Sequence, residues 1–141
     1  MNKRGFTLIE LLVVVAIIGL LSTLAVVALG SARAKSRDAK RLSDLKQIQT
    51  ALELYYTDKG SYPAGDGINL GTTDYACLGT AGFKEAGCTS PYMATLPKDP
   101  NGASYYKYTV GTNTYTIAGK LEGEIEGLKG DIKLTPTGMG M

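Results

Sequence analysis

A run of nineteen uncharged and mostly apolar residues, 11–29, constrains this chain more than any other feature of its sequence. Leucine, valine, isoleucine and alanine fill the run, and the exceptions are Gly19, Ser22 and Thr23. As an α-helix that rises about 1.5 Å per residue, it would reach about 28 Å, close to the thickness of the hydrocarbon core of a membrane. The sequence therefore predicts a membrane-spanning helix near the amino terminus.

Two other interpretations of this run have less support. A secretory signal peptide has an apolar stretch of about 7–15 residues that ends in a small-residue cleavage site. Here the stretch is longer, and a charged segment follows Ala32. A buried helix that is apolar on all sides would need a large apolar remainder to cover it, whereas the rest of this 141-residue chain is mostly polar. We expect the helix to be retained in the membrane.

The composition argues against an enzyme. The sequence contains no His, which removes imidazole acid–base chemistry, Ser-His-Asp or Cys-His nucleophilic catalysis, and zinc sites with histidine ligands. The formal net charge of +2 is too small to indicate nucleic-acid binding. The length allows one folded domain beside the membrane segment.

One acidic residue, Glu10, stands directly before the apolar run. A carboxylate at the centre of a membrane helix costs about 2.5–3.5 kcal/mol on translocon scales, so a carboxylate there suggests a function. At the membrane interface the cost is small, and Glu10 would simply mark the boundary. The position alone leaves both interpretations open.

The surrounding string KRGFTLIE, residues 3–10, is more specific. It combines a short basic leader, Gly5, Phe6 and a glutamate four places later, and it adjoins the apolar helix. This string resembles the type IV prepilin signal, which type IV pilins share with the pseudopilins of type II secretion. The resemblance implies that a prepilin peptidase cleaves after Gly5, which makes residues 1–5 a leader, and that Phe6 then becomes N-methylated.

The resemblance also gives Glu10 a partner, the ammonium group at Phe6 of the next subunit to join the filament. An uncompensated carboxylate in apolar packing is unfavourable, so an approaching ammonium group would favour one axial register. Cleavage is required for this pairing, because the nitrogen of Phe6 is a neutral amide beforehand. The leader removes Lys3 and Arg4, which lowers the count of Lys plus Arg from 15 to 13, equal to the 13 Asp plus Glu.

The basic residues beside the membrane run oppose this topology. Those after the run outnumber the two before it, so a positive-inside count would place the carboxy-terminal part in the cytoplasm. We give the motif more weight and expect a single pass through the inner membrane, with the carboxy-terminal domain outside. The cluster of basic residues that follows the run would then meet lipid phosphates or acidic neighbours. This cluster supports DNA binding only weakly. Its members are Arg33, Lys35, Arg37, Lys40 and Arg41.

The helix is expected to continue beyond the membrane. No Pro precedes Pro63, so we expect one helix over residues 6–59, with a membrane half, 6–30, and an amphipathic half, 31–59, before Gly60 ends it. The alternative is two helices that break near Gly30 and Ser31. Apolar residues at steps of three and four draw a stripe for a small domain to pack against, while Arg41, Lys46, Gln47 and Gln49 occupy other faces. The stripe consists of Leu42, Leu45, Ile48, Leu52 and Tyr55.

Residues 60–102 read as a loop region with short elements, anchored by Cys77 and Cys88. A disulfide between them closes a short ring, with a chain-entropy benefit of roughly 3 kcal/mol, and it forms only in an oxidising compartment. The alternative is two free thiols. A disulfide would support, independently of the leader, a domain outside the cytoplasm.

An antiparallel sheet of three or four strands is expected over residues 103–136. Residues 104–110 and 114–119 read as a hairpin, residues 131–135 as a further strand, and residues 137–141 as a frayed tail. The predicted fold is α+β and pilin-like, with the long helix packed against this sheet. Residues 96–102, with Tyr106 and Tyr108 after them, resemble the segment ahead of the sheet in major pseudopilins.

No cofactor is expected, with one open question. Major pseudopilins often hold Ca²⁺ in their carboxy-terminal loop, but this sequence departs from that pattern. Its acidic residues there are Asp131 and three glutamates that alternate with other residues, a spacing that is not a recognisable Ca²⁺ loop. We interpret the stretch as a solvated acidic turn and leave Ca²⁺ as the alternative. The glutamates are Glu122, Glu124 and Glu126.

The sequence thus predicts a structural subunit of a pilus-like filament rather than an enzyme. Residues 96–108 favour a secretion pseudopilin over a type IV major pilin. The expected partners are other copies of the chain, the prepilin peptidase, an inner-membrane assembly platform, and lipid before assembly. The alternative is a membrane-tethered minor pilin that binds DNA or a receptor.

Overall fold

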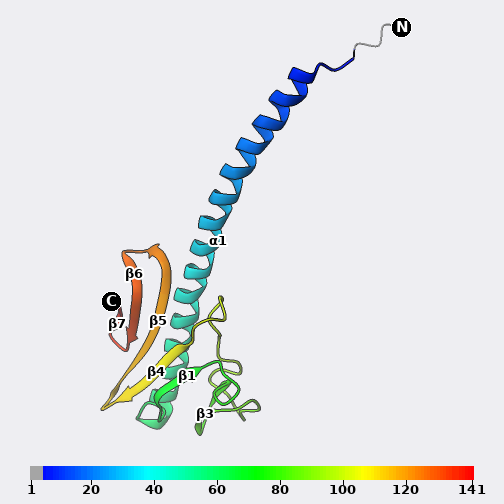
Figure 1. Ribbon diagram of the computed structural model, residues 1–141. Coiled ribbons are helices and arrows are strands. Elements are labelled where there is room, and N and C mark those ends of the chain that lie inside the picture. Colours follow the sequence, from blue (N-terminus) through cyan, green and yellow to red (C-terminus); the bar gives the residue numbers. More distant parts are fainter. Residues whose placement is uncertain (1–4) are drawn as a thin grey trace. The chain divides into compact units, whose positions relative to one another are not determined.

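The computed structural model describes residues 5–141, which divide into a first unit ending at Ala34 and a second unit, Lys35–Met141. In these residues one helix, α1 (Leu8–Lys59), precedes seven strands (Figure 1). Lys3 and Arg4, which the prepilin motif assigns to the leader, lie outside the described residues. The strands are β1 (Asp66–Leu70), β2 (Cys77–Gly79), β3 (Gly82–Lys84), β4 (Tyr106–Gly111), β5 (Thr114–Ile125), β6 (Leu128–Thr135) and β7 (Gly138–Gly140).

Helix α1 follows the sequence expectation closely. It is helical through Gly30 and Ser31, so the alternative of two separate helices is wrong. It begins at Leu8, two residues later than predicted, and ends at Lys59. Gly60 closes it with a φ of 71° and an amide that donates to the carbonyl of Tyr56 at 2.8 Å. Glycine is favoured at such a left-handed helix end because it has no Cβ.

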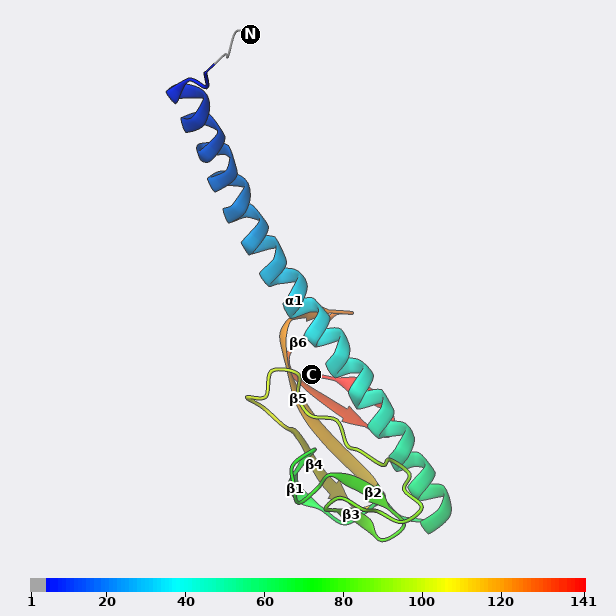
Figure 2. The ribbon, with the colours of Figure 1, turned by 90° about the vertical axis from the view of Figure 1, so that its right-hand side faces the viewer.

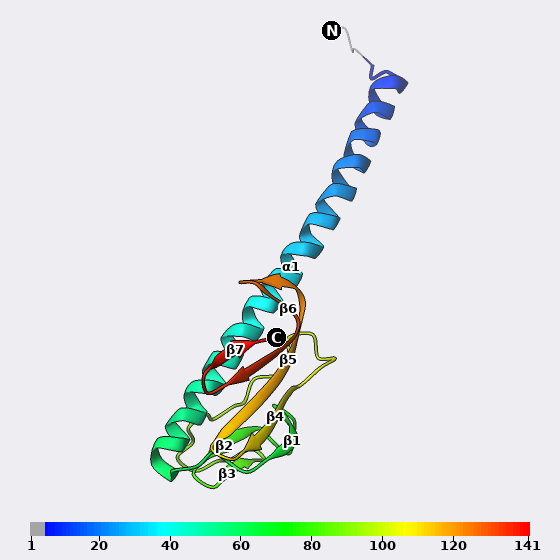
Figure 3. The same ribbon diagram turned by 90° about the vertical axis from the view of Figure 1, so that its left-hand side faces the viewer.

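The main sheet is antiparallel, with the strand order β1-β4-β5-β6-β7. The predicted hairpin is present as β4 and β5, with Tyr108 opposite Ile117, and Ile117 in turn opposite Leu134 of β6. In the second unit one face of this sheet lies against α1 (Figures 2 and 3). The predicted α+β class is therefore confirmed.

The sheet has five strands rather than the predicted three or four. The first addition, β1, lies in the predicted loop region, where Gly67 interrupts the alternation and produces a bulge. The second, β7, lies in the predicted frayed tail and pairs with β6, while Met139 packs against the core. Both are short edge strands whose order depends on pairing with a neighbour. Neither contains the run of β-branched and aromatic residues that signals a strand in a sequence.

The other predicted loop residues form a small second sheet of β2 and β3. Cys77 and Cys88 form the predicted disulfide, with their Cα atoms 6.1 Å apart. All three residues of β2 are buried, and Leu78 in its centre exchanges hydrogen bonds with Met93. The disulfide therefore fixes a buried strand rather than an open loop.

The core lies between α1 and the main sheet. Leu45, Ile48 and Leu52 of the predicted stripe are fully buried and belong to one cluster with the inward-facing side chains of β4, β5 and β6. Burial of a leucine or isoleucine side chain contributes about 1.5–3 kcal/mol. The stripe prediction is confirmed, with Leu42 also buried and Tyr55 partly buried at its end.

Candidate assembly site

The amino-terminal end of α1 is closed by Thr7 and Glu10. The Thr7 amide and hydroxyl both donate to Oε2 of Glu10, at 2.8 and 2.7 Å, and the Glu10 amide donates to Oγ1 of Thr7 at 3.3 Å. This reciprocal pair is a capping box, which satisfies amide groups that the first turn of a helix leaves without partners. The T-x-x-E spacing signals such a cap, and sequence reasoning missed it because it assigned Glu10 to the prepilin motif alone.

The cap gives Glu10 a role within its own chain. Two donors and the positive end of the helix dipole face its carboxylate, which offsets part of the penalty for a charge beside apolar residues. The three hydrogen bonds lie at an exposed position, so the carboxylate remains accessible.

The residues of the predicted processing site are also accessible. Phe6 is 83% exposed, and the space around Gly5 is open to beyond 4 Å from the position of an added Cβ. Phe6 and Glu10 line one shallow hollow of about 390 Å³ with Ile9, Val13 and Val14. The structure thus brings the predicted cleavage residue and the predicted assembly residue to the same end of α1.

The apolar run forms a helix with its side chains uncovered. From Leu8 to Leu29 the large apolar side chains are between 45% and 77% exposed, and this part of α1 is long and apolar enough to cross a membrane. A contiguous apolar surface of this size is unfavourable in water. It therefore requires lipid or other protein around it.

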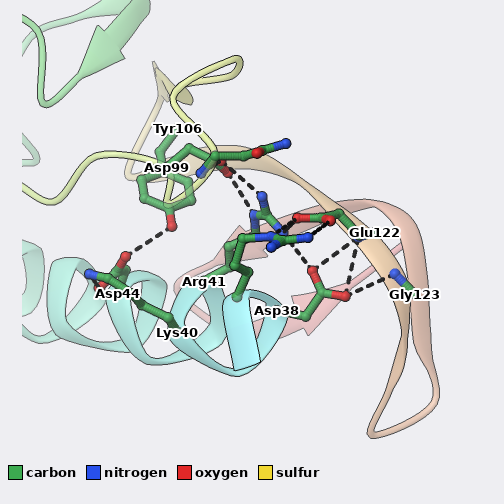
Figure 4. A network of polar contacts seen from close by, with 10 residues as sticks. Asp38, Lys40, Arg41, Asp44, Asp99, Tyr106, Glu122 and Gly123 are labelled. Atoms are coloured by element: carbon green, nitrogen blue, oxygen red, sulfur yellow. Dashed lines mark hydrogen bonds and ion pairs between the residues drawn. The ribbon is translucent and has the colours of Figure 1, made fainter. Parts of the chain in front are cut away.

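The second unit contains a buried ionic network centred on Arg41, which is 3% exposed (Figure 4). Its Nε and Nη2 donate to the two carboxylate oxygens of Asp99 at 2.7 and 2.9 Å. Its Nη1 donates to Asp38 at 2.7 Å and to Glu122 at 2.8 Å. One guanidinium group thus joins α1, the segment before β4, and β5.

Further hydrogen bonds complete the network. Asp38 accepts the backbone amides of Glu122 and Gly123, at 3.0 and 2.8 Å, and Arg37 donates its Nε to Glu122 at 2.7 Å. Hydrogen bonds from Arg37 and then Arg41 lower the pKa of Glu122 to about 2. Hydrogen bonds from Arg41 likewise lower the pKa of Asp99. The carboxylates of Glu122 and Asp99 are therefore held in their ionised forms.

These contacts correct two sequence expectations. Arg41 was placed on a polar face outside the apolar stripe, but it is buried, because carboxylates from three segments compensate its charge. Glu122 and Glu124 were interpreted as part of a solvated turn, but both belong to β5. Only Glu126 lies in the turn, and no pattern within residues 121–127 signals that Glu122 meets a guanidinium group.

A second buried polar pair lies beside the network. The Tyr106 hydroxyl donates to Oδ2 of Asp44 at 3.0 Å, and Lys40 reaches the other oxygen at 3.9 Å (Figure 4). Burial raises the pKa of Asp44 and of Tyr106 above their ordinary values. This pair holds α1 to β4 within the apolar core.

Within residues 5–141, no three acidic or thiol side chains gather as potential metal ligands. Glu124 lies opposite Lys129 in the β5–β6 hairpin, and Glu126 occupies the turn with a φ of 52°. Calcium binding in this stretch therefore stays an untested prediction.

The comparisons with known proteins agree with these features. The family model for the prokaryotic N-terminal methylation motif matches residues 1–30, and the model for type II secretion system (T2SS), protein G, matches residues 28–132. The chain belongs to the type II secretion system protein G family. The predicted resemblance to type IV pilins and secretion pseudopilins is thereby confirmed.

Individual relatives support the same family. The type II secretion system core protein G of Vibrio cholerae is 32% identical over 111 residues, which cover 78% of this chain and 73% of the relative. The core protein G of Klebsiella pneumoniae is 34% identical over 112 residues, covering 78% and 77%. The type IV major pilin PilA of Myxococcus xanthus is 41% identical over 61 residues, covering 43% and 28%. No solved structure matches the chain.

Membership of the protein G family settles the broad class of the chain. The family is a structural component of a secretion system, so the prediction of a filament-type subunit rather than an enzyme is confirmed.

Proposed function

We propose that this chain is the main building block of the pilus-like filament of a type II secretion system. A prepilin peptidase cleaves it after Gly5, and Phe6 becomes the N-methylated terminus. Residues 6–30 hold the subunit in the inner membrane with Lys35–Met141 outside, until an assembly platform in that membrane adds it to the filament.

The uncovered apolar helix with a capped carboxylate at its end carries this proposal. Before assembly, lipid can cover the side chains from Leu8 to Leu29, and after assembly the same helices of other copies can do so. Both environments are apolar, so a subunit can exchange one for the other at little cost. The disulfide supports a second unit outside the cytoplasm.

Glu10 sets the register of assembly in this proposal. Its carboxylate is accessible while the Thr7 donors hold it in place. Cleavage creates an ammonium group at Phe6, and the Phe6 ammonium of an incoming copy can approach Glu10 in one axial position only. The pairing offsets a charge that apolar helix packing would otherwise leave uncompensated.

Two substitutions at Glu10 separate assembly from capping. Glu10→Gln keeps an acceptor for the capping box but removes the charge, whereas Glu10→Ala removes both. We expect both variants to insert and to be cleaved, and neither to appear among sheared filaments. Normal polymerisation of Glu10→Gln would show that the cap, and not the charge, is what Glu10 supplies.

Processing is tested at the cleavage site. Gly5→Leu is expected to accumulate as uncut precursor, because a side chain at this position obstructs the peptidase. Mass spectrometry of the wild-type amino terminus is expected to show methylated Phe6. A native protein that retains Met1 in assembled filaments would contradict the proposal.

A secretion filament and a surface pilus are distinguished by a gene deletion. The protein G model covers most of the second unit, whereas the match to the major pilin PilA covers 43% of the chain. We therefore expect the deletion to abolish secretion of exported proteins and to leave surface pili unchanged. A loss of pili with normal secretion would assign the chain to a type IV pilus instead.

A further inference from the structure

Figure 3 shows the face of the main sheet that is turned away from α1. Exposed lysines on the adjacent strands β4, β5 and β6 belong to this face. Lys107 of β4 and Lys133 of β6 both lie opposite Ala118 of the central strand β5. Neighbouring strands are about 4.8 Å apart, which places the two lysine backbones roughly 10 Å apart with a small side chain between them. Lys120 lies two residues further along β5, opposite Asp131.

These side chains surround a shallow hollow of about 240 Å³. Ala118 and Gly119 form part of its lining, and Tyr105, 48% exposed, lies at the hollow as well. In the part of the chain that the structure describes, none of the three lysines forms a salt bridge. We call Lys107, Lys120 and Lys133 with this hollow the basic face. With Asp131 included, it keeps a net positive charge.

Negatively charged side chains lie at the β5–β6 hairpin of the same unit. Glu124 and Glu126 are both exposed, and we call them the acidic tip. Lys129 faces Glu124 across the hairpin, whereas Glu126 stands in the turn itself. The tip and the basic face therefore offer complementary charges on different surfaces of one chain.

The backbone of Glu126 supplies a second observation. Its φ of 52° and the φ of 78° at Gly127 define a tight hairpin turn in which both central residues are left-handed. Asparagine or glycine fits the first position of such a turn with less strain than glutamate. A strained residue with an exposed functional group points to a use for that group.

We propose that the acidic tip of one copy of this chain docks in the basic face of a second copy. The inference rests on the proposed function, because it describes how the second units of neighbouring filament subunits meet. The two surfaces differ, so the contact is head-to-tail, the type of contact that builds an open filament when its rotation does not close a ring. Its complementary charges select the partner and the register more than they add affinity.

Charge reversal in the full-length chain tests the contact. Lys107→Glu with Lys133→Glu, or Glu124→Lys with Glu126→Lys, is expected to lower the yield of sheared filaments at least tenfold. The four substitutions together restore opposite charges and are expected to return the yield to near the wild-type value. The matched control, Lys84→Glu with Lys98→Glu, reverses two exposed lysines elsewhere in the same unit and is expected to leave the yield unchanged.

Two further variants separate docking from folding. Glu126→Asn relieves the turn, so we expect a higher thermal midpoint together with fewer filaments. Ala118→Cys combined with Glu126→Cys is expected to give a ladder of cross-linked multimers under oxidation, because each copy offers one tip and one face.

The outcomes also distinguish this inference from the proposed function. If the wild-type chain polymerises and Glu10→Gln does not, while the reversals and the cysteine pair have no effect, the docking contact is wrong and the proposed function stands. The docking contact would also be overturned if the lysine reversals formed normal filaments and the cysteine pair gave no cross-link, while the reversals abolished binding of the basic face to a different, anionic protein. A wild-type chain that never polymerises would overturn both.

Discussion

Arg41 shows how a single residue holds distant segments of this protein together. Its guanidinium group is buried and contacts carboxylates that are 3, 58 and 81 positions away in the sequence. A buried ion pair offers little net stability against well-packed apolar residues, but removal of one partner leaves the others uncompensated. The planar group with five donors is suited to this geometry, whereas lysine could not form the two-pronged contact with Asp99.

We expect Arg41→Ala to destabilise the second unit by about 3–5 kcal/mol, because Asp38 and Asp99 would remain buried without a counter-charge. Urea unfolding of the full chain in detergent, followed by tyrosine fluorescence, measures the change. Lys40→Ala is the control, since the Lys40 side chain is exposed and its contact with Asp44 spans 3.9 Å, which makes it worth about 0.5 kcal/mol or less. Equal effects of the two variants would contradict a structural role for the network.

The network also predicts a pH dependence. The folded pKa of Glu122 is about 2, below its ordinary value of 4.5, and the pKa of Asp99 is lowered as well. The stability from these groups is fully present above pH 4.5 and is lost as the pH falls from there towards 2. The raised pKa of Asp44 has the opposite effect, because it favours the folded state as the pH falls. It concerns one group, whereas two groups, Glu122 and Asp99, have lowered pKa values.

We therefore expect the thermal midpoint to fall steeply below pH 4.5 in the wild-type chain and less steeply in Glu122→Gln. Calorimetry between pH 7 and pH 2 makes the comparison. The same slope in both proteins would show that Glu122 does not contribute to acid unfolding.

At the scale of elements, the disulfide and the small β2–β3 sheet give order to a segment with few apolar residues. The ring between Cys77 and Cys88 encloses both strands, and Leu78 anchors β2 in the core. A loop of this length gains roughly 3 kcal/mol from closure in the chain-entropy description. The strands of the main sheet pair with one another and with no residue of β2 or β3, so the disulfide acts on the main sheet only through side-chain packing in the core.

We expect Cys77→Ala combined with Cys88→Ala to lower the free energy of unfolding by about 3 kcal/mol and to expose residues 71–95 to proteolysis. Limited proteolysis with mass spectrometry locates the cuts. Cuts that appear first in β4 to β6 would show that the disulfide supports the whole domain instead of this segment.

At the scale of the whole molecule, the two units have opposite solvent preferences. Among the described residues, the large exposed apolar side chains gather in 6–29, and the second unit adds Leu54, Tyr105 and Met141. Isolated apolar residues of this kind are normal on a soluble surface. The second unit also contains Arg37, Arg41 and every partner of the ionic network.

We expect residues 35–141, expressed alone in an oxidising compartment, to be a soluble monomer with the thermal midpoint of the full chain. Exposed ionic contacts are worth about 0–1 kcal/mol each, so the proposed docking contact should not assemble the fragment without the apolar helix. Analytical ultracentrifugation measures the mass. Aggregation of the fragment would show that the second unit needs the first one to fold.

Local patterns made much of this protein predictable. The apolar run, the prepilin motif, the stripe that includes Leu45 and Ile48, and the pair of cysteines each depend on spacing along the chain. Periodicity and turn residues likewise located the β4–β5 hairpin. The capping box of Thr7 and Glu10 was equally local and could have been found.

What the sequence by itself determined is the apolar helix, the amino-terminal methylation motif, and the face of α1 that is buried, because each follows from residues within a few positions of one another. Only the tertiary structure decided that Arg41 meets Asp99 and Glu122, and that β1 and β7 extend the sheet. Those contacts join segments that are far apart in the chain. The ionic contacts of Arg41 gain strength because burial lowers the local dielectric constant, and the edge strands form because a neighbouring strand supplies their hydrogen bonds.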